Sequence, residues 1–349
     1  MASAHPLPPL SLLRPTPRGL WCEAGGFFID PNGPVDRAVI THGHSDHARS
    51  GHGAVLATPE TLAIMAARYG EDFAATVQPL PYGQTARVGD VTVRLVPAGH
   101  VLGSAQVVLE QGPWRVVASG DYKRRRDPTC PAFEPTPCDV FVTEATFALP
   151  VFRHPPASDE IDRLLHSLEQ FPDRTHMVGA YALGKAQRVI RLLREAGYDR
   201  PIHVHGALER LNAVYERFGV DLGPIAPATA NATGGASDLR GEIVIAPPSA
   251  LADRWSRRFA DPVIAVASGW MRVRARARQR GAELPLIISD HADWDELTET
   301  LTELSPSETW ITHGREDALC RWAAINGLQA RALHLVGYDD EDDADTGPA

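Results

Sequence analysis

Residues 41–48 read Thr-His-Gly-His-Ser-Asp-His-Ala, and this segment concentrates four side chains that bind metal ions: His42, His44, Asp46 and His47. The whole chain of 349 residues has only 14 histidines, so composition alone does not explain three of them within six positions. Crowded imidazoles repel one another when they are protonated, and they contribute little as core residues. The segment therefore predicts a metal site, and chemistry of this kind is typical of a hydrolase.

The elements around this segment are of the kind that hold ligands rigidly. The run Arg37-Ala-Val-Ile-Thr before it has the apolar, β-branched character of a buried strand end. Six further candidates also follow or end strand-like runs, where α/β active sites are built: Asp30, His100, Asp121, Glu144, His291 and His313. Imidazole and carboxylate ligands without thiolates suit zinc, manganese or iron. With Asp121 as a bridging carboxylate, seven ligands can hold two divalent ions that lower the pKa of a bridging water and clamp a phosphate: His42, His44, Asp46, His47, His100, Asp121 and His313.

Composition is that of an ordinary globular protein, with 44% hydrophobic and 22% charged residues. The sequence has no apolar run of about 18 residues, which argues against a transmembrane helix and a membrane partner. The proline-broken N-terminus is a poor signal peptide, and the four cysteines lack a metal-binding spacing. We therefore expect a cytoplasmic protein with reduced thiols. The net charge of −10 argues only mildly against a nucleic-acid partner, because the acidic residues 339–345 account for much of it.

The chain changes character near residue 157. Before that point, short apolar runs between Gly, Pro and Asp predict strands over 38–40, 92–96, 106–110, 115–118 and 139–143, with one helix over 59–69. After it, strands over 177–180, 201–205, 241–246 and 263–267 alternate with helices that begin near 158, 184, 208 and 251. Such alternation predicts a parallel, doubly wound sheet. A strand over 286–289, a helix over 294–304 and a strand over 309–312 then follow, with the last ligand candidates, so the α/β segment is an insertion.

The ordered set of ligand candidates, with Asp30, resembles the metallo-β-lactamase fold. Glu144 and Ser289-Asp-His-Ala-Asp293 resemble its β-CASP branch of nucleic-acid-processing nucleases, as do Ala180–Ile190 and the Ala267-Ser-Gly-Trp-Met271 turn. Over residues 20–338 the chain is most similar to the bacterial DNA-ligase-associated DNA exonuclease family. The resemblance implies an α/β fold, a metallo-β-lactamase αββα sandwich with an inserted doubly wound β-CASP domain. The expected boundaries are an irregular lead-in over 1–19, the metallo-β-lactamase domain over 20–150 and 285–338, the β-CASP domain over 151–284, and a disordered acidic tail over 339–349.

The resemblance also implies roles for the candidate residues. His42, His44 and His100 would hold one metal ion, Asp46, His47 and His313 the other, and Asp121 would bridge the two. Asp30 would orient a ligand imidazole through its far nitrogen. The catalytic set would be Asp46, His291 as general acid and Glu144, which poises His291. The eukaryotic DNA-repair nucleases of the branch usually lack the last histidine, whereas His313 is present here, so the RNA-cleaving members are a fair comparison as well.

Two turns are candidate phosphate sites. Gly184-Lys185, with Tyr181 nearby, and Ser268-Gly269 each lie between a strand and a helical or basic segment, where backbone N–H groups bind anions. A pocket for a 5′-phosphate there is the hypothesis, and a helix cap with a solvated lysine is the alternative. Lys123, in the basic run Lys123–Arg126, is a further candidate phosphate contact, and the arginines at alternating positions 272–280 are either a nucleic-acid contact or a solvated helix.

The sequence thus predicts a metal-dependent DNA exonuclease that acts on single-stranded DNA with recognition of a 5′ end. It would use two divalent ions, zinc or manganese. The resemblance further implies an ATP-dependent DNA ligase and a helicase of the same repair pathway as partners. Three alternatives remain: an RNA-processing nuclease of the same fold, a small-molecule metallohydrolase and a non-catalytic scaffold. The inserted domain argues against the small-molecule enzyme, and the full ligand set argues against the scaffold.

Overall fold

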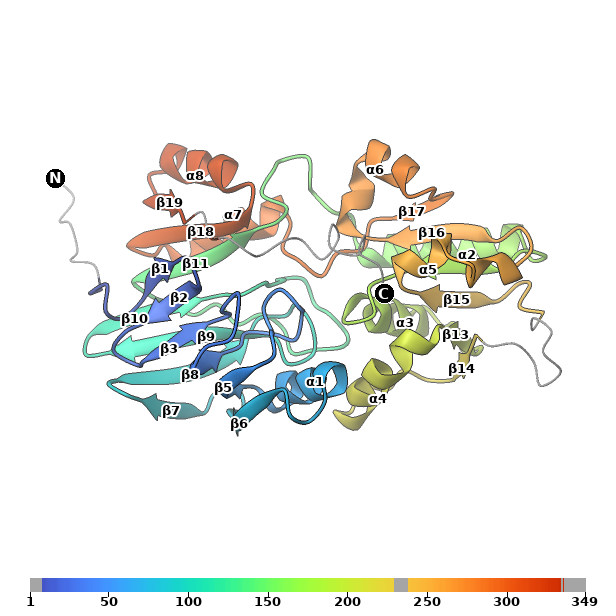
Figure 1. The fold of residues 1–349 in the computed structure, drawn as a ribbon. Coiled ribbons are helices and arrows are strands. Elements are labelled where there is room, and N and C mark those ends of the chain that lie inside the picture. Colours follow the sequence, from blue (N-terminus) through green and yellow to red (C-terminus); the bar gives the residue numbers. More distant parts are fainter. Residues whose placement is uncertain (1–7, 229–237, 334, 336–349) are drawn as a thin grey trace. The chain divides into compact units, whose positions relative to one another are not determined.

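The chain divides into two compact units in a computed structural model, which describes residues 8–228, 238–333 and 335 (Figure 1). The first unit runs to Arg153 and resumes at His291, and the second unit is His154–Asp290. The mixed α/β class expected from the sequence is confirmed. The acidic tail expected over 339–349 lies outside the described residues.

Two sheets form the frame of the first unit. One has six strands in chain order: β1 (Arg14–Thr16), β2 (Gly19–Cys22), β3 (Phe27–Ile29), β4 (Arg37–Val39), β5 (His52–Ala57) and β6 (Ala74–Pro79). The other has seven strands in the order β19-β18-β11-β10-β9-β8-β7. These are β7 (Thr85–Val88), β8 (Val91–Pro97), β9 (Ala105–Gln111), β10 (Trp114–Ala118), β11 (Val140–Ala145), β18 (Glu308–Gly314) and β19 (Ala330–Ala332).

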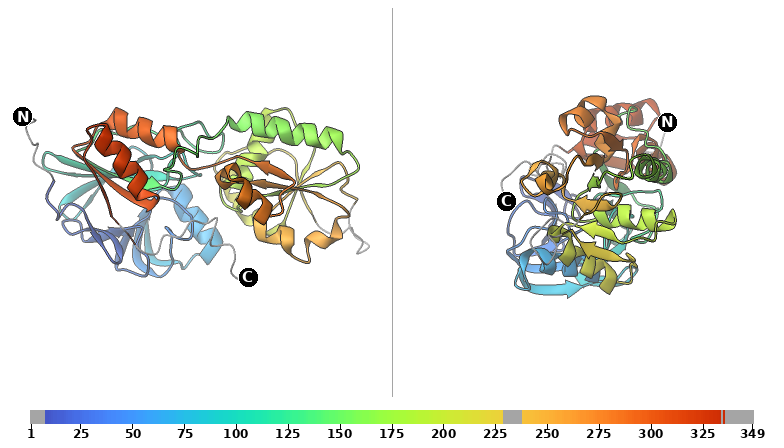
Figure 2. Two further views of the ribbon diagram at one scale, coloured as in Figure 1. Left: turned by 90° about the horizontal axis from the view of Figure 1, so that it is seen from above. Right: turned by 90° about the vertical axis from the view of Figure 1, so that its right-hand side faces the viewer.

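Three apolar clusters stack this unit into layers. Alternate residues of the two sheets face each other in the central cluster, as Phe27 and Ile29 do with Val93 and Val107. The opposite face of the seven-stranded sheet packs against α7 (Trp294–Leu304) and α8 (Glu316–Ile325). The opposite face of the six-stranded sheet packs against α1 (Pro59–Tyr69). The order of layers is therefore helix, sheet, sheet, helix (Figure 2).

The second unit is built on one six-stranded sheet in the order β14-β13-β15-β12-β16-β17. All strand pairs in the described part of this sheet are parallel, as the strand–helix alternation predicts. Its strands are β12 (His176–Gly179), β13 (Ile202–Val204), β14 (Ile225–Pro227), β15 (Ile243–Ala246), β16 (Val263–Ala267) and β17 (Leu284–Leu286). All residues of β12 and β15 are buried, so both faces of the sheet are covered. The helices are α2 (Ala157–Gln170), α3 (Lys185–Glu195), α4 (Glu209–Arg217), α5 (Pro248–Ala252) and α6 (Arg274–Gln279).

Several expected elements differ from those in the structure. The lead-in expected to be irregular contains β1. The helix expected over 251–257 is replaced by the shorter α5 and a 3₁₀ turn at Ser256–Arg258, because the chain is extended at Asp253 between them. The strand expected over 286–289 is β17, which ends at Leu286. None of the helices within the described part of the chain is long and apolar enough to cross a membrane.

Candidate metal centre

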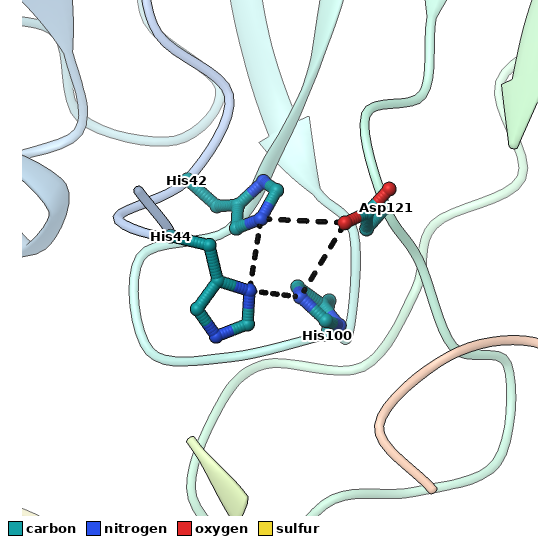
Figure 3. Close-up of side chains that lie close together, drawn as sticks. All are labelled: His42, His44, His100 and Asp121. Atoms are coloured by element: carbon teal, nitrogen blue, oxygen red, sulfur yellow. Dashed lines mark hydrogen bonds and ion pairs between the residues drawn. The ribbon is translucent and has the colours of Figure 1, made fainter. Parts of the chain in front are cut away.

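Three imidazoles and one carboxylate converge in the first unit, as Figure 3 shows. His42 and His44 lie in the loop after β4, His100 in the loop between β8 and β9, and Asp121 just after β10. The Nδ1 atom of His44 lies 3.1 Å from Nε2 of His42 and 3.0 Å from Nε2 of His100. The Oδ2 atom of Asp121 lies 3.4 Å from Nε2 of His42 and 3.9 Å from Nε2 of His100. Four ligand atoms within 4.8 Å of one another form a donor set of the kind that zinc or manganese accepts.

A second group of donors shares the Asp121 carboxylate with the first. Nε2 of His47 lies 3.3 Å from Oδ2 of Asp121 and 3.4 Å from Oδ2 of Asp46. The ring of His313, near the end of β18, has its centroid 5.3 Å from that of His47. One oxygen of Asp121 thus lies between an imidazole of each group. The structure brings together all seven residues that the sequence nominates as ligands.

Close main-chain approaches bring the three ligand loops together. Gly120, with φ +57°, comes so near Thr41 that a Cβ atom would lie 2.7 Å from the Thr41 side chain. Gly99, with φ +75°, comes so near Lys123 that a Cβ atom would lie 2.3 Å from its carbonyl oxygen. Only glycine fits such positions, because it has no Cβ and tolerates left-handed backbone. These two glycines therefore set the spacing between the loops of His42, His100 and Asp121.

Asp30 lies behind the cluster and orients it. Its Oδ2 atom is 2.8 Å from Nδ1 of His47, so the Nε2 atom of that ring is turned toward Asp121. Its Oδ1 atom accepts a hydrogen bond of 2.8 Å from the N–H of Thr41, and the Thr41 hydroxyl donates to Oδ2 over 2.5 Å. Asp30 has φ +43°, a costly backbone conformation for a residue with a Cβ, and these bonds hold it there.

The protonation states of His42 and His313 suit cation binding. Burial, and next the charge on His47, lower the pKa of His42 well below its usual value and that of His313 to about 4. Burial opposes protonation of His47 too, but the Asp46 and Asp121 carboxylates outweigh it and raise its pKa well above the usual value. A neutral imidazole is the form that ligates metal. Moreover, Oδ1 of Asp46 is buried without a hydrogen-bond partner among the described residues. The residues therefore fit divalent ions.

His291 and Glu144 form a pair beside the cluster. Nδ1 of His291 lies 2.9 Å from Oε2 of Glu144 and 4.0 Å from Oδ2 of Asp121. Glu144 is buried in β11, and its Oε1 atom accepts a hydrogen bond of 2.8 Å from the N–H of Tyr122. The carboxylate thus binds one ring nitrogen of His291, which leaves Nε2 as the atom available to exchange a proton.

Comparisons with known proteins agree with this site. No protein-family model matches the chain. A protein named "Probable DNA ligase" from Opitutus terrae is 28% identical over 93% of this chain and 31% of its own length. "Ribonuclease TTHA0252" from Thermus thermophilus is 27% identical over 50% of this chain and 46% of its own length. The chain therefore spans about a third of the first relative and under half of the second.

These relatives point to the metallo-β-lactamase/β-CASP nuclease family. A crystal structure of a protein of unknown function from Enterococcus faecalis superposes with a TM-score of 0.59 at 13% identity, over 84% of this chain and 78% of that one. At that identity the match shows a shared fold alone.

Lys123, a candidate phosphate contact, is not at the surface. Its side chain is 4% exposed and its Nζ atom lies 3.0 Å from Oε2 of Glu296. The rest of the basic run is also engaged: Arg124 pairs with Glu299 and Glu303, and Arg125 pairs with Asp293. The position of the run directly after Asp121 suggested a phosphate contact, but these cations pair with acidic residues of α7 and with its N-cap Asp293. The structure gives no support to Lys123 as a nucleic-acid contact.

The two candidate phosphate turns lie at the same edge of the second unit's sheet. Gly184-Lys185 follows β12 and Ser268-Gly269 follows β16, and these strands are neighbours. The Ser268 hydroxyl accepts from the N–H of Trp270 over 3.2 Å and caps a 3₁₀ turn. The alternative of a helix cap with a solvated lysine does not hold for Lys185, because its side chain is only 5% exposed. Its Nζ atom lies 3.1 Å from Oδ1 of Asp290 and 5.0 Å from the ring centroid of Tyr181. Its role in phosphate binding stays a prediction.

Glu296 is a buried residue that is not among the site candidates predicted from the sequence. Its only local signature in the sequence is Asp293-x-x-Glu296, a capping box at the start of α7. Burial opposes its ionisation, yet the Lys123 ammonium and the N–H groups of Arg125 and Asp293 lower its pKa from 4.5 to about 2. Because the lowered pKa belongs to the folded state, Glu296 stabilises the protein above pH 4.5, and this contribution is lost as the pH falls from 4.5 toward 2.

The Glu296→Gln variant tests this contribution. We expect it to unfold at lower urea concentration than the parent protein at pH 6, and the gap to narrow as the pH falls below 4.5, since glutamine resembles the protonated acid. Urea titrations at pH 6, 4.5 and 3 measure the difference. A gap that stays constant over this range would contradict the prediction.

Proposed function

We propose that this chain is a metal-dependent phosphodiesterase, a DNA exonuclease of DNA repair that acts on single-stranded DNA from a recognised 5′ end. The fold would be the metallo-β-lactamase αββα sandwich, the first unit, with the second unit as its inserted β-CASP domain. The observation that carries the proposal is the Asp121 oxygen between the His42 and His47 imidazoles, at 3.4 and 3.3 Å. A carboxylate shared between two sets of donors would hold two ions close together, and two-metal phosphodiester hydrolysis requires such a pair of ions.

The ligand roles follow the two groups of donors. His42, His44 and His100 would hold one divalent ion, Asp46, His47 and His313 would hold the other, and Asp121 would contact both. Zinc and manganese both suit this set. When bound, two such ions supply Lewis-acid activation of a water and stabilise charge on the phosphate. Asp30 keeps His47 in the tautomer with Nδ1 protonated, so that Nε2 faces the site.

His291 and Glu144 would serve the leaving oxygen. Glu144 accepts from Nδ1 of His291 and so favours the imidazolium form, which carries its second proton on Nε2. That proton would go to the O3′ or O5′ atom as the phosphodiester bond breaks. Asp46 completes the catalytic set, because its buried Oδ1 has no partner among the described side chains and main-chain groups and is available as a ligand.

The choice of DNA as substrate is part of the proposal. It is supported by the match of the relative named as a DNA ligase to 93% of this chain. The matched segment makes up 31% of the ligase-named protein, which supports an ATP-dependent DNA ligase as a functional partner, together with a helicase of the same pathway.

End-labelled single-stranded DNA and RNA of matching sequence, incubated with the protein and Mn²⁺ or Zn²⁺, test the proposal. Release of mononucleotides from DNA alone is the expected result. Internal RNA fragments would overturn the assignment in favour of an RNA-processing nuclease. If neither DNA nor RNA is hydrolysed, the nuclease proposal itself is wrong.

Lys185 is the residue through which a 5′-phosphate pocket can be tested. We expect Lys185→Ala to slow cleavage of 5′-phosphorylated DNA roughly tenfold or more, because a hydrogen bond to a charged group contributes about 1.5–3 kcal/mol. Ends with a 5′-hydroxyl should be slowed less. The rate ratio of the two substrates is the measurement, and an unchanged ratio would contradict the pocket. Asp290→Asn is the matched control, since it removes the same buried ion pair and keeps the ammonium.

A further inference from the structure

A buried ion pair links two loops of the first unit that carry site residues. The side chains of Lys123 and Glu296 are each 4% exposed, and their charged atoms lie 3.0 Å apart. Taking two charges out of water costs several kcal/mol per ion, so a buried pair is by itself weak evidence for stability. The pair joins the loop after β10, which holds Asp121, to the first turn of α7, which follows His291.

Glu296 connects these loops through all of its acceptor positions. Its Oε1 atom accepts from the N–H groups of Arg124 and Arg125, at 3.0 and 2.7 Å. Its Oε2 atom accepts from the Lys123 ammonium at 3.0 Å and from the N–H of Asp293 at 3.1 Å. Three of these four donors belong to the loop after β10, and the fourth is the N–H of Asp293 at the start of α7, so the carboxylate contacts both main chains at once.

Lys123 extends the connection to His291 itself. Its Nζ atom donates a hydrogen bond of 3.0 Å to the carbonyl oxygen of His291. The next N–H, that of Ala292, donates to the carbonyl oxygen of Tyr122 over 2.6 Å. The main chain of His291 is thus held by Lys123 and Tyr122, while its ring is held by Glu144.

We propose that Lys123 and Glu296 are positioning residues, which hold the main chain of His291 so that its imidazole stays in place beside Asp121 for proton transfer. The inference rests on the proposed function, because it takes His291 as the proton donor. Neither residue touches the substrate. A shift of about 1 Å in a catalytic group can reduce the rate of reaction about 10²-fold, so the pair matters for kcat rather than for substrate binding.

The test compares the Lys123→Met/Glu296→Gln double variant with the parent protein. Removing both charges leaves no unpaired buried ion, so the double variant should be more stable than Lys123→Met alone. The His291 carbonyl nevertheless loses its donor. We expect kcat on single-stranded DNA to fall roughly 10²-fold, with KM and bound metal unchanged. With bis-p-nitrophenyl phosphate, whose leaving group needs no proton, the loss in kcat should be much smaller than the loss on DNA.

Arg153→Met is the matched control, because it removes an exposed ion pair to Asp295 in the same first turn of α7. It should change neither substrate's kcat. Equal losses on DNA and on the activated ester in the double variant would show a structural role only and overturn the inference, as would a parent-like kcat on DNA. If His291→Ala discriminates between the two substrates and the double variant does not, the positioning role fails while the proposed function stands. If His291→Ala does not discriminate either, the assignment of His291 fails first.

Discussion

Asp121→Asn should abolish phosphodiester hydrolysis and most metal binding. The substitution keeps the shape of the side chain but removes the charge from the oxygen that lies 3.4 Å from His42 Nε2 and 3.3 Å from His47 Nε2. Metal activation contributes several kcal/mol to a transition state of this kind. Since each 1.4 kcal/mol is a factor of about ten in rate, we expect a fall of about 10³-fold or more.

Two measurements check this result. Elemental analysis of dialysed protein gives the metal content, and single-turnover cleavage of labelled DNA gives the rate. Asp30→Asn is the matched control, because it removes a carboxylate on the far side of His47 and should cost about 10- to 100-fold in affinity or activity. An Asp121→Asn protein that retains both metal and activity would rule out the shared carboxylate.

His291→Ala should separate proton transfer from metal binding. General acid catalysis contributes about 10²- to 10⁴-fold, so kcat on DNA should fall within that range. Metal content should not change, because His291 Nδ1 is bound to Glu144 at 2.9 Å and lies 4.0 Å from Asp121. An ester with a p-nitrophenolate leaving group should be hydrolysed at close to the parental rate.

His166→Ala is the control, because it removes an exposed histidine of α2 in the second unit. It should leave kcat on DNA and on the activated ester unchanged. If His291→Ala slows DNA and the activated ester equally, or if it loses metal, then His291 acts as a ligand or a structural residue and not as the acid.

Local sequence signals were sufficient for several elements. The helices over 59–69 and 294–304 are predicted with the bounds that the structure has. Both begin with strong local caps, Thr58 before a proline and Asp293 in a capping box. Strand β6, by contrast, is an edge strand whose residues are mostly exposed, so it has neither the alternation nor the apolar run by which a strand is predicted.

The sequence by itself predicted a metal site, because four potential ligands, His42, His44, Asp46 and His47, fall within six consecutive residues. The sequence also placed each of the other candidates at or after the end of a predicted strand. Only the tertiary structure decided that the Oδ2 atom of Asp121 lies between the His42 and His47 imidazoles. It also decided which basic side chains are buried in ion pairs, as Lys123 is. Lys123 looks like a surface lysine in the sequence, and its partner Glu296 is 173 residues away along the chain. Burial and charge pairing at that separation depend on how the sheet and α7 pack, which no local pattern encodes.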